Sequence, residues 1–150
     1  RFGLRAPVVT GVLLVAGGLA LLARVPLEGS FAVDVLPAMI LLGLGAGTAL
    51  NPVLLAAMGE VDPGDAGLAS GVVNTSFMMG GALGLAVLAS LAASRTLDLI
   101  AHGHAERAAL LGGYQWAFLV GALFAFTASI LAARLLGGLS ATPAMDSTAA

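Results

Sequence analysis

The sequence predicts an all-α membrane protein with four transmembrane helices. Hydrophobic residues make up 59% of the 150-residue chain and charged residues only 9%, and the mean hydropathy is +1.05. Soluble domains carry about a quarter charged residues. The charges are also segregated, because the six arginines and eight acidic residues fall at the edges of four apolar stretches or between them. A helix crosses a bilayer with about 20 apolar residues, and a charge at its centre costs at least about 2.5–3.5 kcal/mol. This distribution of charge is the one that a lipid environment imposes.

Each apolar stretch is predicted to form one transmembrane helix. The predicted helices cover residues 7–23, 33–58, 66–94 and 114–136. Pro7 suits the first turn of its helix, where a missing N–H leaves no hydrogen bond unmade. Asp34 is expected to cap the second helix. Tyr114 and Trp116 open the fourth helix and are residues typical of a membrane–water boundary.

The intervals between the helices are short. We expect residues 1–6 to be the remainder of a loop before the first helix, and residues 137–150 to be a tail that begins with Gly137 and Gly138. Asp62, followed by Pro63, is expected to begin the third helix. Residues 95–113 form the longest polar interval, which we expect to be a loop, with helical spacing of its apolar residues that allows a short interfacial helix.

Two asparagines, Asn51 and Asn74, lie inside the predicted helices. Pro52 cannot donate a hydrogen bond to the carbonyl of Thr48, so the second helix should bend there, with Asn51 beside the bend. Freed backbone groups at membrane depth are tolerated where they face protein or a water-filled cavity. Asn51 and Pro52 are therefore candidates for lining or gating a substrate cavity, the alternative being a static packing bend. Asn74 is the corresponding candidate in the third helix, with helix–helix hydrogen bonding as its alternative role.

Pairs of glycines four residues apart place small residues on one helix face and allow a neighbouring backbone to approach closely. This spacing predicts helix-packing roles for six glycines: Gly43, Gly47, Gly67, Gly71, Gly80 and Gly84.

Several function classes are disfavoured. The net charge is −2 without a basic cluster, which argues against nucleic-acid binding, and the chain has no cysteine for a zinc-thiolate site or a disulfide. His102 and His104 are two residues apart, so they would not face each other on a helix, and we interpret them as solvated loop residues. No hydrolase, zinc-protease or phosphate-binding motif is found. We expect no catalytic residue, no metal ligand and no cofactor.

The order of the motifs resembles a known family. Arg1-Phe-Gly3-Leu-Arg5 resembles the end of the Asp-Arg-x-Gly-Arg-Arg loop signature of the major facilitator superfamily, with Leu4 where a second basic residue is usual. The later motifs resemble the last helices of its fourteen-helix drug:proton antiporters; they are Gly43-Leu-Gly45-Ala-Gly47, Asn51-Pro52, the run from Asp62 to Thr75, and Met79-Gly80-Gly81-Ala-Leu-Gly84.

The resemblance implies that the four helices are the last four of the C-terminal bundle of a proton-coupled exporter of hydrophobic or cationic compounds in the plasma membrane. It implies cytoplasmic positions for both ends of this chain and for the loop at 59–65, an extracytoplasmic position for residues 95–113, and a role for Arg1, Gly3 and Arg5 in the loop signature. The partners would be the lipid bilayer, the preceding helices of the same protein, and the substrate and protons that the intact protein carries. The proton-coupling acids would lie in those preceding helices.

A second hypothesis stays open. The chain could be a complete four-helix membrane protein that serves as an assembly scaffold and transports nothing. The genomic sequence upstream of Arg1 would distinguish the two hypotheses. The sequence leaves the identity of the substrate and the oligomeric state undetermined.

Overall fold

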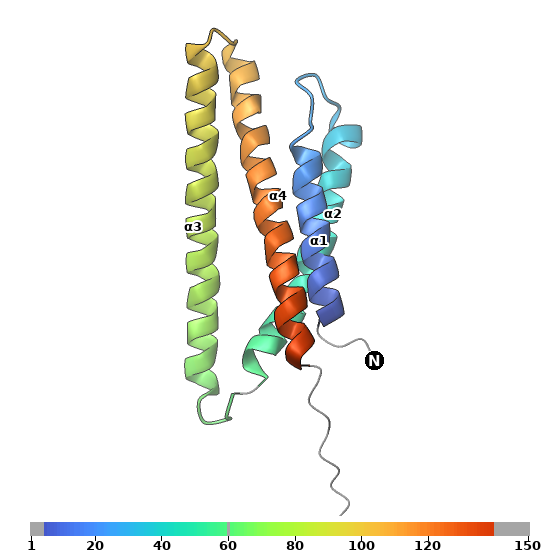
Figure 1. Cartoon of the computed structure of the whole chain (residues 1–150), viewed down its shortest axis with the longest axis vertical. Helices are drawn as coiled ribbons and strands as arrows, with labels where there is room; N and C mark the ends of the chain where they lie inside the picture. Colours follow the sequence, from blue (N-terminus) through green and yellow to red (C-terminus); the bar gives the residue numbers. More distant parts are fainter. Residues whose placement is uncertain (1–4, 60, 140–150) are drawn as a thin grey trace, which may run out of the picture.

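Four long helices, connected by short turns, run alternately up and down in the computed structural model, which describes residues 5–59 and 61–139 (Figure 1). Side chains are described for residues 6–59 and 61–135. The elements are α1 (Arg5–Leu22), the short π-helical segment η1 (Phe31–Val35), α2 (Leu36–Met58), α3 (Ala66–Ala101) and α4 (Glu106–Leu139).

Three helical segments are long and apolar enough to cross a membrane. They are Phe31–Met58, Ala66–Ala101 and Glu106–Leu135, and the apolar helix Ala6–Leu22 is shorter. The chain is therefore a helical membrane protein, as the segregation of charge predicts.

The helices do not contact one another evenly. α1 packs closely against α2 on one side and α4 on the other, and α3 packs against α4, whereas α2 and α3 contact each other at only a few positions (Figure 1). The spatial order is therefore α2, α1, α4, α3. Because α3 stands at the end of this order and packs closely only against α4, the rest of its surface is uncovered by the other described helices.

The contact between α1 and α2 is close because small residues face each other. A Cβ atom added to Gly45 would lie 2.6 Å from the carbonyl oxygen of Gly11, and one added to Gly18 would lie 2.9 Å from the carbonyl oxygen of Ala38. Neither position has room for a side chain. Small residues of this kind allow close backbone approach between membrane helices. We call the α1–α2 contact formed by Gly11, Gly18 and Gly45 the glycine seam.

Two hydrogen bonds hold α4 to the first part of the chain. Gln115 Nε2 donates to the carbonyl oxygen of Val25 at 2.7 Å, just beyond the end of α1. Ser129 Oγ, which is buried, donates to the carbonyl oxygen of Val9 at 3.4 Å. The two bonds are far apart along α4, so they fix its register against α1.

The predicted loop at 95–113 is largely helical. α3 continues to Ala101 and α4 begins at Glu106, which leaves residues 102–105 as the turn. Arg95 and Asp98 form an ion pair at 2.8 Å on the surface of α3. The helix ends just before Gly103, whose φ of +85° is a backbone conformation that glycine adopts readily and other residues do not. Charged residues mark where a helix leaves lipid rather than where it ends, and the loop prediction was wrong for this reason.

Other helix ends also differ from the predictions. The second helical stretch begins at Phe31 with Ser30 as its N-cap, so Asp34 lies inside it, and Asp34 Oδ2 accepts a hydrogen bond of 2.8 Å from the backbone N–H of Ser30. α3 is preceded by Asp65 rather than by Asp62. α4 continues through Gly137 and Gly138 to Leu139, and the rest of the predicted tail lies outside the described residues.

Candidate functional site

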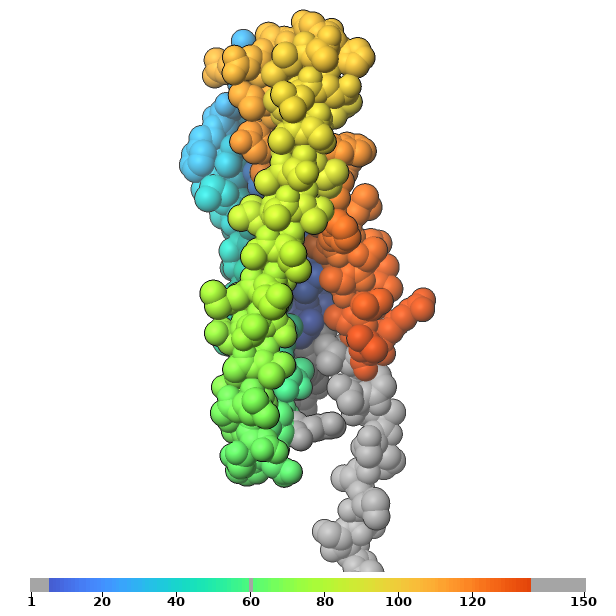
Figure 2. Space-filling model, turned by 90° about the vertical axis from the view of Figure 1, so that its left-hand side faces the viewer, coloured from blue at the N-terminus to red at the C-terminus, as the bar shows by residue number. Residues whose placement is uncertain are grey.

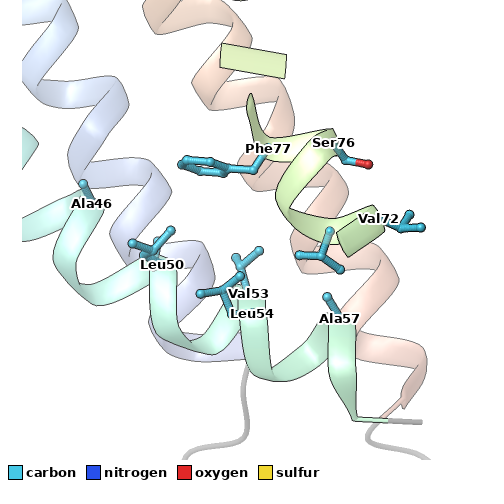
Figure 3. A pocket seen from close by; sticks show the side chains of 10 residues that line it. Ala46, Leu50, Val53, Leu54, Ala57, Val72, Ser76 and Phe77 are labelled. Atoms are coloured by element: carbon cyan, nitrogen blue, oxygen red, sulfur yellow. The ribbon is translucent and has the colours of Figure 1, made fainter. Parts of the chain in front are cut away.

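An apolar groove lies between the end of α2 and the beginning of α3 (Figure 3). Its volume is about 600 Å³. It is lined by Ala46, Ala49, Leu50, Val53, Leu54, Ala57, Val72, Val73, Ser76 and Phe77. We call this surface the α2–α3 groove.

The course of α2 explains why the groove is open. Pro52 lies inside α2 and has no N–H for the carbonyl of Thr48. The last part of α2 turns away from α1 toward the start of α3 (Figure 1). The two helices diverge from their short connection at 59–65, so their side chains line a groove instead of interdigitating.

The lining is suited to binding apolar groups rather than to covalent chemistry. Ser76 is the only polar lining residue, and its hydroxyl points away from α2 (Figure 3). The ring of Phe77 reaches from α3 toward α2, near Leu50 (Figure 3). Among residues 5–59 and 61–139 no three metal-ligating side chains come together. The groove can therefore offer van der Waals and aromatic contacts to a hydrophobic compound.

The structure does not bring the predicted cavity residues together. Asn51 is exposed and Pro52 half-buried, and neither belongs to the groove lining. Asn74 is also exposed, and its Nδ2 lies 4.0 Å from the sulfur of Met78, one turn further along α3. Asn51 therefore lies next to the groove without facing it, and Asn74 has no polar contact with a neighbouring helix among the described residues.

Sequence reasoning missed the residues that line the groove. On α3, Val73, Ser76 and Phe77 share a face because they are three and four residues apart, and Asn74 lies about 100° around the helix from Val73. In a chain with 59% hydrophobic residues, an apolar residue carries no sequence signal that distinguishes a groove lining from a lipid-facing surface. The sequence signal that could have identified part of the lining is the position of Leu50, Val53 and Leu54 next to Pro52, because a bend in a helix exposes the side chains that flank it.

Among the described residues, the glycines in close contact are not the six predicted ones. A Cβ atom added to any of the six would meet nothing within 4 Å among the described residues; they are Gly43, Gly47, Gly67, Gly71, Gly80 and Gly84. Close approach occurs instead in the glycine seam and at Gly113, where an added Cβ would lie 2.5 Å from the carbonyl oxygen of Ala92. No partner for the six predicted glycines lies among the described residues, so their packing role stays a prediction, and Gly67 and Gly71 line a shallow hollow on α3.

Arg1 and Gly3 of the predicted loop signature lie outside the described residues. Arg5 is the first residue of α1.

Large apolar side chains cover the outside of α3. Figure 2 shows this helix along its whole length with no other helix in front of it. Leu68 is 74% exposed, Leu85 71% and Phe77 64%. Surfaces of this kind are covered by lipid or by other protein in a membrane.

The chain is similar to proteins named for drug resistance. It is 35% identical over 148 residues to the puromycin resistance protein of Streptomyces alboniger, an alignment that covers 96% of this chain and 29% of that protein. It is 38% identical over 91 residues to the lincomycin resistance protein of Streptomyces lincolnensis, covering 61% of this chain and 19% of that protein. It is 33% identical over 108 residues to the multidrug resistance protein Stp of Mycobacterium tuberculosis, covering 72% and 20% respectively.

The chain therefore spans less than a third of the length of each of these relatives. No protein-family model matches it, and no solved structure matches it.

Proposed function

We propose that this chain forms the last four helices of a drug exporter of the major facilitator superfamily, a proton-coupled antiporter in the plasma membrane. The observation that carries the proposal is the alignment of 96% of the chain with 29% of a puromycin resistance protein. The order of the sequence motifs supports the same family. The large apolar side chains exposed on α2 and α3 also fit a chain that packs against further helices of the same protein.

The α2–α3 groove is the proposed contribution of this chain to the drug path. Its lining carries no charge, and its single aromatic side chain, Phe77, is well exposed. An apolar lining with an aromatic ring suits hydrophobic compounds, and a ring can also attract a cation over its face. The proposed role of the groove is binding, and we assign it no enzymatic step.

Transport would follow the alternating movement of two helical bundles around a central site. The described helices have no acidic residue in the interior of their apolar segments, so the residues that couple the proton would lie in the preceding helices. In this arrangement both ends of the chain face the cytoplasm. The preceding helices, the lipid, the drug and the protons are the proposed partners.

Expression in a drug-sensitive bacterium tests the proposal. The reading frame that contains this chain is expressed in a strain that lacks its main drug exporters, and resistance to puromycin, lincomycin and ethidium is measured. We expect resistance to at least one compound and a lower accumulation of ethidium that returns to the control value when a protonophore dissipates the proton gradient.

A protein that reaches the membrane at normal abundance but changes neither resistance nor accumulation would contradict the proposal. A reading frame that begins at this chain and encodes only its four helices would favour the scaffold hypothesis instead.

A further inference from the structure

A second pocket lies at the end of the bundle that holds the α1–η1 connection and the α3–α4 turn (Figure 1). Its volume is about 530 Å³. Unlike the α2–α3 groove, it has charged walls, because Arg24 and Arg95 both line it. The remaining walls include the polar side chain of Gln115, the indole of Trp116, and the apolar side chains of Leu99 and Leu119. No acidic residue belongs to the lining.

The pocket is held in shape by packing between its walls. Gln115 Nε2 donates to the carbonyl oxygen of Val25 at 2.7 Å, and this bond fixes the residue next to Arg24 against α4. On the other wall, the glycines of α4 let α3 approach so closely that a Cβ added to Gly112 would lie 2.7 Å from Cδ1 of Leu99. Arg24 therefore projects from the turn after α1, which the bond from Gln115 ties to α4, and Arg95 projects from α3, which packs against α4.

The donors of the two arginines are mostly available. Arg95 Nη1 is paired with Asp98 Oδ2 at 2.8 Å, and the other oxygen of Asp98 lies 3.4 Å from His102 Nδ1. A guanidinium has five N–H donors, so this pair leaves most of those of Arg95 free for another anion. A phosphate group accepts bidentate hydrogen bonds from guanidinium groups.

The position of the pocket selects the kind of phosphate. Trp116 and Tyr114 are 46% and 56% exposed at this end of α4, and such residues lie at the level of lipid headgroups. The leucine side chains and the indole would lie beside an acyl chain or a glycerol backbone. A soluble phosphate would leave these apolar walls unused.

We propose that this pocket binds the headgroup of an anionic phospholipid. Arg24 and Arg95 hold the phosphate, Gln115 supplies a polar wall beside it, and Trp116, Leu99 and Leu119 contact the apolar part of the lipid. The site is separate from the α2–α3 groove and does not depend on drug transport.

Lipid binding to the purified intact protein tests the site. The protein encoded by the reading frame that contains this chain is delipidated in detergent and titrated with phosphatidylglycerol, phosphatidylcholine or inorganic phosphate, and binding is measured by native mass spectrometry and by the shift in melting temperature. We expect phosphatidylglycerol to bind at least about ten-fold more tightly than phosphatidylcholine, because both lipids carry a phosphate but only phosphatidylcholine would place a second positive charge, its choline, beside Arg24 and Arg95. We expect inorganic phosphate to give little shift.

Charge-removing variants locate the binding. Arg24→Gln and Arg95→Gln should each weaken phosphatidylglycerol binding about ten-fold. Arg107→Gln removes the same charge at the same end of the molecule, from a residue that does not line the pocket, and should leave binding unchanged. Arg24→Lys keeps the charge but not the planar fork, so its binding should fall between those of Arg24→Gln and the unchanged protein.

Equal binding of the two lipids by the unchanged protein would overturn the proposal without the use of any variant. Equal losses in Arg24→Gln and Arg107→Gln would overturn it as well, because they would indicate a general attraction to positive charge. If inorganic phosphate binds as tightly as phosphatidylglycerol, the pocket is a site for a soluble anion and the lipid assignment is wrong.

Discussion

The glycine seam and the α2–α3 groove are built on the same helix and differ in every respect that matters for function. In the seam, α2 lies so close to α1 that backbone atoms replace side chains as the contact surface. In the groove, which begins at Ala46 beside the seam, the side chains stand apart from α3 and line about 600 Å³. The lining continues past Pro52 to Ala57, so the groove spans the bend, whereas the seam lies before it. The same helix thus offers one surface to α1 and another to a ligand.

The difference teaches that glycine content alone does not identify a packing surface in a membrane helix. Gly45 is closely packed, whereas Gly43 and Gly47, two residues away on either side, face open space. A glycine stabilises a helix pair only where a second backbone is present. At Gly43 and Gly47 no other backbone of the described residues lies within reach of an added Cβ.

The largest expected effect comes from filling the seam. Gly45→Val would place side-chain atoms on the backbone of Gly11 and Val15, and we expect it to destabilise the intact protein by about 3 kcal/mol. Gly47→Val, the matched control, adds the same side chain where nothing lies within 4 Å and should change stability by less than about 0.5 kcal/mol. Thermal unfolding in detergent measures both. Equal losses of stability in Gly45→Val and Gly47→Val would show that close backbone packing in the glycine seam does not stabilise the protein.

Straightening α2 should separate stability from function. Pro52→Ala restores an N–H for the carbonyl of Thr48, so we expect stability to rise by about 1 kcal/mol while drug efflux falls several-fold, because the bend that opens the groove is lost. Pro37→Ala is the control, since it makes the same substitution in the same helical stretch, but far from the bend and outside the groove lining. Efflux that stays at the original rate in Pro52→Ala, with the helix stabilised, would mean that the bend has no part in transport.

A smaller effect is expected from the groove lining. Phe77→Ala removes an aromatic contact and should weaken drug binding about ten-fold, with little change in stability because the ring is 64% exposed. Asn74→Leu, three residues earlier and outside the lining, should change binding by no more than about two-fold. Fluorescent-drug titration of both variants measures the difference. A larger loss in Asn74→Leu would restore Asn74 as the drug contact and remove that role from Phe77.

The smallest expected effect concerns the contact between α4 and the first part of the chain. Gln115→Leu removes the hydrogen bond to Val25 and should lower stability by about 1 kcal/mol without altering drug binding to the groove. Thr127→Val is a suitable control, because the hydroxyl of Thr127 bonds only to the carbonyl of Phe124 in its own helix. Unchanged melting of Gln115→Leu would indicate that this bond does not fix α4 against α1.

The fold class and the number of helices could be predicted from the sequence because lipid imposes a strong constraint on composition. Helix ends were harder, since Arg95 and Asp98 continue a helix that the loss of hydrophobicity seemed to end. Pro52 was identified because its effect is covalent and local. The groove could not be predicted, because it depends on which face α2 buries against α1 and which face α3 buries against α4. Apolar residues such as Leu50 and Phe77 look alike in sequence whether they face lipid, protein or a cavity.

Drug protection of a single cysteine in the groove tests the central claim most directly. The chain itself has no cysteine, so Phe77→Cys and Leu97→Cys are made separately in the intact protein with any other cysteines replaced. Leu97 is 68% exposed on the same helix but does not line the groove. We predict that a drug to which the protein confers resistance slows maleimide labelling at position 77 several-fold and leaves position 97 unaffected. Equal labelling at position 77 with and without saturating drug would contradict the assignment of the groove to the drug path.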